Sequence, residues 1–162
     1  MVVSDHFSAT DIFLDADVKN KKSLLELIAG EVARRLGRTE EEILDVLKAR
    51  EDLGSTALGK GVALPHAKLS DIETPVKLFL RLERPIDFEA RDGEPIDLVF
   101  VVLWPAAAPK GLLEAISGIA RNLRDAGFLR RLRQAATPEE VVELLRTCAT
   151  TTEEQDAAPR ET

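Results

Sequence analysis

One histidine of this sequence lies in a setting suited to phosphoryl chemistry. His66 directly follows Pro65 at the end of a short apolar run, and the segment before it contains Gly54, Gly59 and Gly61. Imidazole is substantially unprotonated near neutral pH, and a ring nitrogen can form a reactive covalent intermediate. The other histidine, His6, lies in an N-terminal stretch with no pattern. We therefore expect His66 to be the functional centre and to accept a phosphoryl group.

Three residues upstream of His66 are of the types that hold phosphate. Arg50 offers a planar fork of donors that matches phosphate oxygens, and Ser55 and Thr56 offer two hydroxyls. The backbone amides of a glycine-rich loop add further donors. The alternative is a structural histidine that only bonds to a backbone carbonyl. The neighbouring residues favour a phosphate site made of His66, Arg50, Ser55 and Thr56.

Other chemistries fit the sequence less well. A structural zinc site needs about four ligands, and the chain has two histidines and one distant cysteine, Cys148. The stretch around Lys60 lacks the spacing of a P-loop and has no Ser or Thr after the lysine. No serine lies in a G-x-S-x-G turn. We expect no metal and no cofactor.

Composition restricts the possible partners and location. The chain has 162 residues, a net charge of -7 at pH 7 and a sequence pI of about 5.0. An acidic chain without a broad basic excess is a poor nucleic-acid binder. No apolar run approaches the roughly 18 residues that a membrane helix needs, and no signal peptide is evident. We expect a cytoplasmic protein without membrane insertion.

The apolar patterns predict an α/β protein with one sheet. Strand-like runs occur at 11–15, 62–64, 76–82 and 96–103, and the last is nearly continuous, which is typical of a strand buried on both faces. Helical periodicity and capping patterns predict helices over 21–36, 39–51, 110–123, 128–132 and 137–147. This order predicts a three-layer α/β/α sandwich. The expected domain is 10–149, between an extension over 1–9 and a disordered acidic tail over 150–162.

The segment 50–67 resembles the type-2 enzyme IIA proteins of the bacterial phosphotransferase system (PTS), of the fructose and mannitol type. The matching positions are Glu51, Leu58, Gly59 and the A-L-P-H run that ends at His66. The similarity in element order extends from about Thr10 to Leu145. The chain length and the R-E-x-x-G-S-T run are most like the nitrogen-regulatory branch.

This resemblance implies the fold, the chemistry and the partners. It implies an α/β/α sandwich with a central mixed sheet and phosphorylation of His66 at Nε2 by an HPr-like phosphocarrier protein. It implies that Arg50, Ser55 and Thr56 stabilise the phosphoryl group. Such a protein is a phosphoryl carrier with a phosphohistidine intermediate rather than a turnover enzyme. In the nitrogen-regulatory branch, the phosphorylation state is read by partners such as sensor kinases or potassium transporters.

Two positions depart from the family pattern. Relatives usually carry a second histidine in a later helix, and the pattern places Leu112 there. Leucine cannot donate a hydrogen bond, so phosphohistidine could be shorter-lived or onward transfer impaired. Ala57 stands where a glycine is common. Two alternatives to a regulatory protein therefore stay open: a sugar-specific IIA that passes phosphate to a IIB cysteine, and an interaction module that is not phosphorylated.

Overall fold

The computed structural model describes the backbone of residues 7–157 and the side chains of residues 7–147. His6 and Cys148 therefore lie outside the described side chains. The elements, in chain order, are η2 (Ala9–Asp11), β1 (Ile12–Ala16), α1 (Lys21–Leu36), α2 (Glu40–Asp52), β2 (Ala57–Gly59), β3 (Val62–Ala63), β4 (His66–Leu69), β5 (Val76–Ile86), β6 (Ile96–Pro105), α3 (Leu112–Asn122), α4 (Ala126–Gln134) and α5 (Pro138–Ala157).

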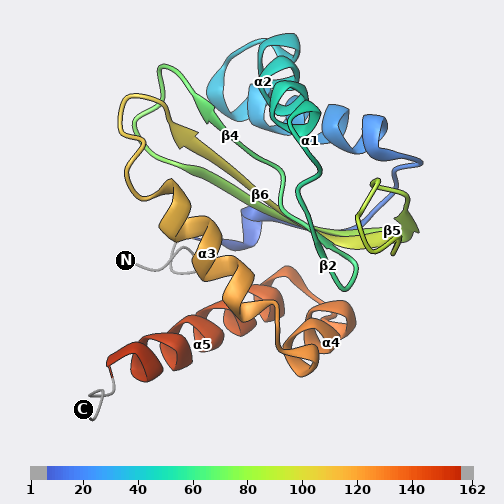
Figure 1. Cartoon of the computed structure of the whole chain (residues 1–162), viewed down its shortest axis with the longest axis vertical. Coiled ribbons are helices and arrows are strands. Elements are labelled where there is room, and N and C mark those ends of the chain that lie inside the picture. Colours follow the sequence, from blue (N-terminus) through green and yellow to red (C-terminus); the bar gives the residue numbers. More distant parts are fainter. Residues whose placement is uncertain (1–6, 158–162) are drawn as a thin grey trace.

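The strands form one six-stranded mixed sheet (Figure 1). Its order is β1-β5-β6-β3-β2, and β4 pairs with β6. β5 and β6 are antiparallel, whereas β1 is parallel to β5 and both β3 and β4 are parallel to β6. The mixed sheet that the resemblance implied is thus confirmed, with β6 at its centre.

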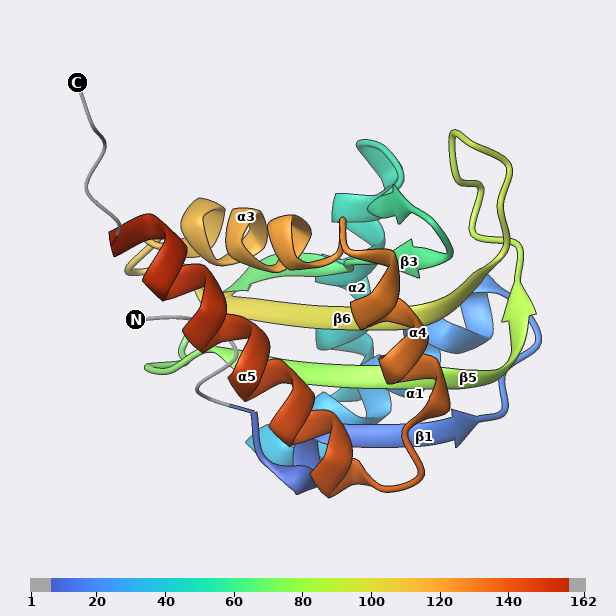
Figure 2. The same cartoon turned by 90° about the horizontal axis from the view of Figure 1, so that it is seen from below.

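Helices cover both faces of the sheet. α1 and α2 lie on one face, and α3, α4 and α5 lie on the other (Figures 1 and 2). Successive side chains of β6 alternate between two apolar clusters: Val99, Val101 and Leu103 pack with α1 and α2, and Leu98, Phe100 and Val102 pack with α3, α4 and α5. The predicted three-layer sandwich is confirmed, as is a strand over 96–103 buried on both faces.

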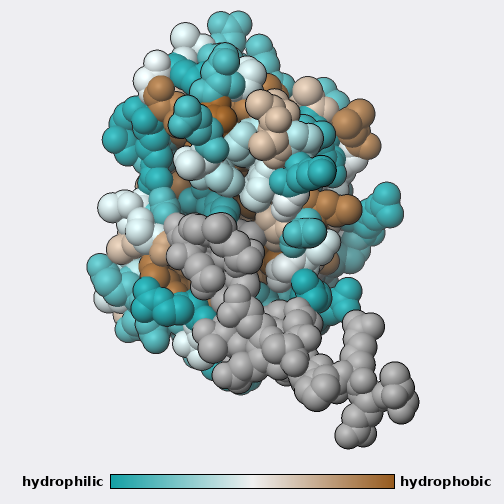
Figure 3. Space-filling view, turned by 90° about the vertical axis from the view of Figure 1, so that its left-hand side faces the viewer, coloured by the Kyte–Doolittle hydropathy of each residue, from teal (hydrophilic) through white to brown (hydrophobic). Residues whose placement is uncertain are grey.

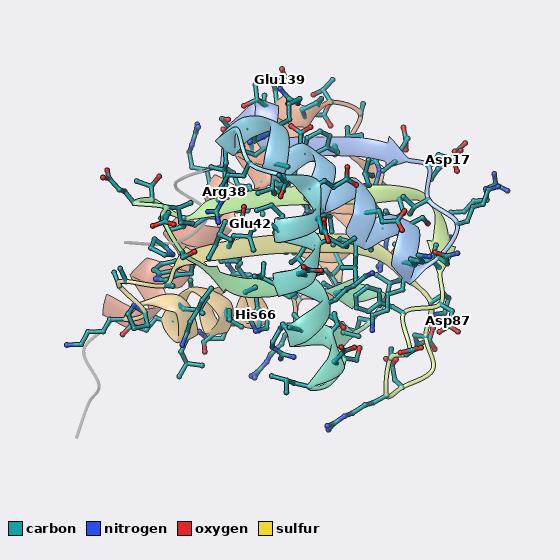
Figure 4. All side chains as sticks on the ribbon, turned by 90° about the horizontal axis from the view of Figure 1, so that it is seen from above. Asp17, Arg38, Glu42, His66, Asp87 and Glu139 are labelled. Carbon is teal, nitrogen blue, oxygen red and sulfur yellow. The ribbon has the colours of Figure 1, made fainter. Side chains whose placement is uncertain are left out.

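Local signals fix the first two helices. α1 has the bounds expected from the sequence, because the Asn20 side chain caps its first turn and Gly37 ends it in a left-handed conformation, at φ 65°. α2 begins after Thr39, whose hydroxyl accepts from the Glu42 amide at 3.3 Å. A full capping box is absent, because the Glu42 carboxylate pairs with Arg38 instead (Figure 4).

The two ends of the described chain differ from the expected domain bounds. Phe7, placed in the N-terminal extension, is buried and packs edge-on against Phe100 with ring centroids 6.4 Å apart. At the other end, α5 continues through residues 150–157, which we assigned to the tail. The end of this stretch contains Glu153, Glu154, Gln155 and Ala157, which favour helix, and no proline occurs before Pro159. Residues 158–162 lie outside the described part.

The sheet also contains two short strands that the sequence did not predict, β2 and β4. His66 is therefore the first residue of a strand rather than the residue after one. β3 and β4 each pair with β6, one after the other along the same edge of that strand. Val62 lies opposite Leu98, and His66 lies opposite Val102. Leu64 and Pro65 form the link between them.

Figure 3 shows the hydropathy of one face of the molecule. On the coloured part of this face, hydrophobic residues occur in small groups separated by hydrophilic ones. Within residues 7–157, no helix is both long and apolar enough to cross a membrane.

Candidate functional site

His66 lies where the end of α2 meets the sheet. As the first residue of β4 it is anchored by parallel pairing with β6, and the Val102 amide donates to the Pro65 carbonyl at 3.1 Å. Arg50 comes from the last turn of α2, and Figure 4 shows His66 beside that helix. The fold thus brings together a histidine on a rigid strand and an arginine on a helix.

Both ring nitrogens of His66 have hydrogen-bond partners. Nδ1 lies 2.8 Å from the Leu64 carbonyl oxygen, and Arg50 Nε donates to Nε2 at 3.2 Å. A carbonyl only accepts, so the partners assign the ring proton to Nδ1 and leave the lone pair on Nε2. The nitrogen that faces Arg50 is therefore the nucleophilic one.

The surroundings keep this imidazole neutral. Burial lowers the pKa of His66 below its ordinary value, and the Arg50 guanidinium acts in the same direction. The hydrogen bond to Leu64 and the Glu51 carboxylate act the other way, without reversing the shift. At neutral pH the ring is thus available as a nucleophile.

Arg50 is itself held in place. Its Nη1 donates to the Gly54 carbonyl at 2.9 Å, and the Gly54 amide donates back to the Glu51 carbonyl at 3.0 Å. The arginine side chain therefore lies between the loop after α2 and the imidazole. A guanidinium in this position can offer its N–H groups to an oxyanion bonded to Nε2.

The hydroxyls of Ser55 and Thr56 bond to groups of the protein other than His66 and Arg50. Thr56 is buried, and its hydroxyl donates to the Glu51 carboxylate. The Ser55 hydroxyl bonds to the Phe88 carbonyl at 3.4 Å and to the Ala57 amide at 3.2 Å. The structure brings Arg50 to His66, but it directs the bonds of both hydroxyls to other groups.

The sequence reasoning gave no role to a buried ion pair behind the site. Glu51 is 9% exposed, and its Oε2 lies 2.9 Å from Nζ of Lys21, at the start of α1. The same carboxylate accepts from the Thr56 amide at 3.4 Å. A signal was present, because Lys21 opens a helix with no acid in its first turn, where a cation is unfavourable.

The loop before His66 depends on Gly61. β2 and β3 are joined by a tight turn in which Lys60 and Gly61 have φ of 56° and 79°. A Cβ on Gly61 would lie 2.7 Å from Nη2 of Arg133 and 2.9 Å from Oδ1 of Asp97. The positive φ of Gly61 disfavours any other residue there, and a Cβ would also have to displace the ends of the Arg133 and Asp97 side chains.

Leu112, at the position of the second family histidine, is the first residue of α3. It is partly buried and packs against the apolar cluster on the α3–α5 side of the sheet. The side chain therefore adds apolar packing and no hydrogen-bond donor. Within the described residues, no group of three or more His, Cys, Asp or Glu could hold a metal ion.

Comparison with known proteins identifies the family. The model of the phosphoenolpyruvate-dependent sugar phosphotransferase system, EIIA 2, matches residues 5–148. The match covers most of the chain and includes both Arg50 and His66. The chain belongs to the PTS EIIA type-2 family.

Individual relatives place it more narrowly. It is 41% identical over 145 residues to a nitrogen regulatory protein of Bradyrhizobium diazoefficiens, with 90% of this chain and 95% of that protein covered. The crystal structure of the nitrogen regulatory protein IIA-Ntr from Neisseria meningitidis superposes with a TM-score of 0.84 and 32% identity, over 88% of this chain and 98% of that one. A fructose-specific EIIA component of Haloferax volcanii is 31% identical, covering 83% and 88% of the two chains. The similarity to nitrogen-regulatory members extends over nearly the whole fold.

Proposed function

We propose that this protein accepts one phosphoryl group on Nε2 of His66 from an HPr-like phosphocarrier and regulates partner proteins according to its phosphorylation state. The observation that carries the proposal is the state of the imidazole. Its hydrogen-bond partners assign the ring proton to Nδ1, beside the Leu64 carbonyl, and leave on Nε2 the lone pair that accepts from Arg50.

The transfer follows from this geometry. The Nε2 lone pair attacks the phosphorus of the phosphorylated carrier, a new N–P bond forms, and the bond from phosphorus to the carrier breaks. The bonding electrons leave with the carrier, and the Nδ1 proton stays on the ring, shared with the Leu64 carbonyl. The ring is prepared for this step because it is neutral before the attack.

Arg50 has two roles in this proposal. Before transfer, its Nε–H donates to Nε2 and keeps the ring oriented. As phosphorus bonds to Nε2, that hydrogen bond opens, and the guanidinium N–H groups turn to the phosphoryl oxygens. Charge-assisted bonds of this kind are among the stronger ones that proteins make. The hydroxyls of Ser55 and Thr56 bond in this structure to Phe88, Ala57 and Glu51, and their contact with the phosphoryl group stays a prediction.

The donor and the regulated partners are other proteins. His66 is only partly buried, so part of the residue is exposed to a carrier. Leu53, directly after α2, is 84% exposed and offers an apolar contact beside Arg50. The names of the nitrogen-regulatory relatives support a regulatory output, for which sensor kinases and potassium transporters are the partner classes to test.

Intact-mass measurement tests the acceptor directly. Purified protein is incubated with phosphoenolpyruvate, enzyme I and an HPr-type carrier. We expect wild type to gain one acid-labile phosphoryl group, His66→Ala to gain none, and His6→Ala to behave as wild type. The chain has only these two histidines, so the pair is a matched control. An unchanged gain in His66→Ala would assign the phosphate to another residue.

Two other functions are supported by specific observations. The fructose-specific relative supports a sugar-specific IIA, which would pass phosphate to a IIB cysteine. Leu112 supports an interaction module that is not phosphorylated. Transfer of label from phosphorylated wild type to a IIB protein would favour the first. No mass gain in the wild type would favour the second.

A further inference from the structure

The buried ion pair behind the site needs an explanation of its own. A buried carboxylate is costly unless it is paired and hydrogen-bonded, and an apolar pair is often as stable as a buried salt bridge. Glu51 is nevertheless buried in the last turn of α2, with its side chain 5% exposed. Its neighbour in sequence, Arg50, is the residue that contacts the imidazole.

Lys21 gathers separate segments around that carboxylate. Its Nζ lies 2.9 Å from Oε2 of Glu51 and 3.6 Å from Oε2 of Glu89, and it lies over the Phe88 ring at 4.5 Å from the centroid. Phe88 in turn accepts a hydrogen bond from Ser55 through its carbonyl. One ammonium group thus connects the start of α1, the end of α2 and the β5–β6 connection.

From Glu51, one route of contacts leads to Nε2 of His66. The carboxylate fixes the last turn of α2, the backbone carbonyl of Glu51 accepts from the Gly54 amide at 3.0 Å, and the Gly54 carbonyl accepts from Arg50 at 2.9 Å. The direction of the guanidinium towards Nε2 therefore depends on how the end of α2 and its loop are held.

A second route leads to Nδ1. The Glu51 carboxylate accepts from both the amide and the hydroxyl of Thr56. The Thr56 carbonyl accepts from the Leu64 amide at 2.9 Å, and the Leu64 carbonyl is the partner of Nδ1 at 2.8 Å. The same carboxylate thus supports the partners of both ring nitrogens.

We propose that Lys21 is a positioning residue for the phosphoryl-acceptor site: its ion pair with Glu51 sets the placement of Arg50 and Leu64 around the His66 ring. This inference rests on the proposed function. It also explains why a lysine opens α1, where the helix dipole disfavours a cation. If Lys21 acted only on folding, its substitution would change the free energy of unfolding without changing the pKa or the tautomer of the His66 ring.

The test compares Lys21→Met with Lys22→Met. Lys22 is the exposed neighbour on the same helix turn, so its substitution makes the same change of charge without touching Glu51. In Lys21→Met, Glu51 loses its countercharge, and we expect the pKa of His66 to rise, because that carboxylate favours the protonated ring. We expect phosphorylation of the folded protein to slow by roughly tenfold or more, as misplaced groups at reacting centres do.

Two further variants separate position from stability. Lys21→Arg keeps the charge, and we expect it to restore most of the rate. Lys21→Met/Glu51→Gln removes both charges, and we expect it to recover folding stability, since no unpaired charge remains, while the rate stays low. A double variant that recovered both would reduce Lys21 to a charge-balancing role and overturn the proposal.

The readouts distinguish this inference from the proposed function. The pKa and tautomer of His66 are measured by NMR on unphosphorylated protein, independently of any carrier. If wild type accepted no phosphate, the proposed function would fail while the NMR comparison still decided the positioning role. If Lys21→Met kept the wild-type pKa, tautomer and rate, the positioning role would be wrong.

Discussion

The two helical layers that cover the sheet contribute differently to the candidate site. The α1–α2 layer supplies Lys21, Arg50 and Glu51, which form a connected set of charges behind and beside His66. The α3–α5 layer supplies Leu112 at the position of the second family histidine, and this residue packs with an apolar cluster. Within the described residues of the two helical layers, the side-chain hydrogen bond to the imidazole thus comes from the α1–α2 layer, and the other bond comes from the Leu64 carbonyl of the sheet.

Polar contacts on the α3–α5 side of the sheet attach a helix to the strands. Arg133 of α4 pairs with Asp97 of β6 at 2.8 Å, and Arg81 of β5 donates to the carbonyls of Leu132 and Ala135 at the end of α4. These bonds fix helix ends to the sheet. If the proposed function holds, we expect acceptance of a phosphoryl group to depend on α2, and we expect the lifetime of the phosphohistidine to depend on Leu112 of α3.

The largest effect is expected from Arg50→Gln, which removes the polar contact to Nε2. We expect phosphorylation to slow about 100-fold, the usual loss when a donor to developing negative charge is removed. We also expect the pKa of His66 to rise, because the guanidinium lowers it in wild type. Radiolabel transfer kinetics and an NMR titration of His66 measure both quantities.

Arg91→Gln is the control for this change, since Arg91 is exposed and its loss alters the net charge equally. We expect neither the rate nor the pKa to change in that variant. An Arg50→Gln protein that accepted phosphate at the wild-type rate would show that the α1–α2 layer is not the source of catalytic support.

The next effect concerns the buried charges of that layer. Glu51→Gln leaves Lys21 without its buried partner, and we expect it to lower the free energy of unfolding by about 2 kcal/mol. Glu89 is the other acid near Lys21, and the Glu89 side chain is 79% exposed. We therefore expect Glu89→Gln to change the free energy of unfolding by no more than about 0.5 kcal/mol. Urea unfolding of the two variants gives the comparison, and equal losses would refute the assignment of Glu51 as the principal partner.

The smallest effect is expected on the α3 side. Leu112→His restores a donor at the family position, and we expect the phosphohistidine lifetime to increase by a factor of roughly 2 to 10, the worth of one hydrogen bond. Leu113→His places the same group on the adjacent residue, which is 76% exposed, and serves as the control. A hydrolysis rate unaltered by Leu112→His would mean that this position does not support the phosphate.

The sequence predicted the elements with strong local patterns. α1 has the expected bounds because its apolar face, Asn20 cap and Gly37 stop all agree. β6 was recognisable because a nearly continuous apolar run fits a strand buried on both faces. β2 and β4 were missed, since strands this short are formed by pairing with β3 and β6 rather than by their own residues.

The part of the candidate site that could be predicted is the part that lies within one short segment of the sequence. His66 and Arg50 were named from the sequence, and the structure places them in contact. The partners of Thr56 and Ser55 were not foreseen, because a hydroxyl fits a phosphate as well as a neighbouring carboxylate or carbonyl. Lys21 was overlooked since it is distant in sequence from Glu51, and only the packing of α1 on α2 brings the two together.

The central claim is that Nε2 of His66 is the phosphoryl acceptor while Nδ1 keeps its proton. Long-range proton–nitrogen NMR spectra of the ring, recorded before and after treatment with the phosphorylated carrier, test it most directly. We expect a neutral ring protonated at Nδ1 before transfer, and phosphorus coupled to Nε2 afterwards. A ring protonated at Nε2 at the start, or phosphorus coupled to Nδ1 at the end, would contradict this account.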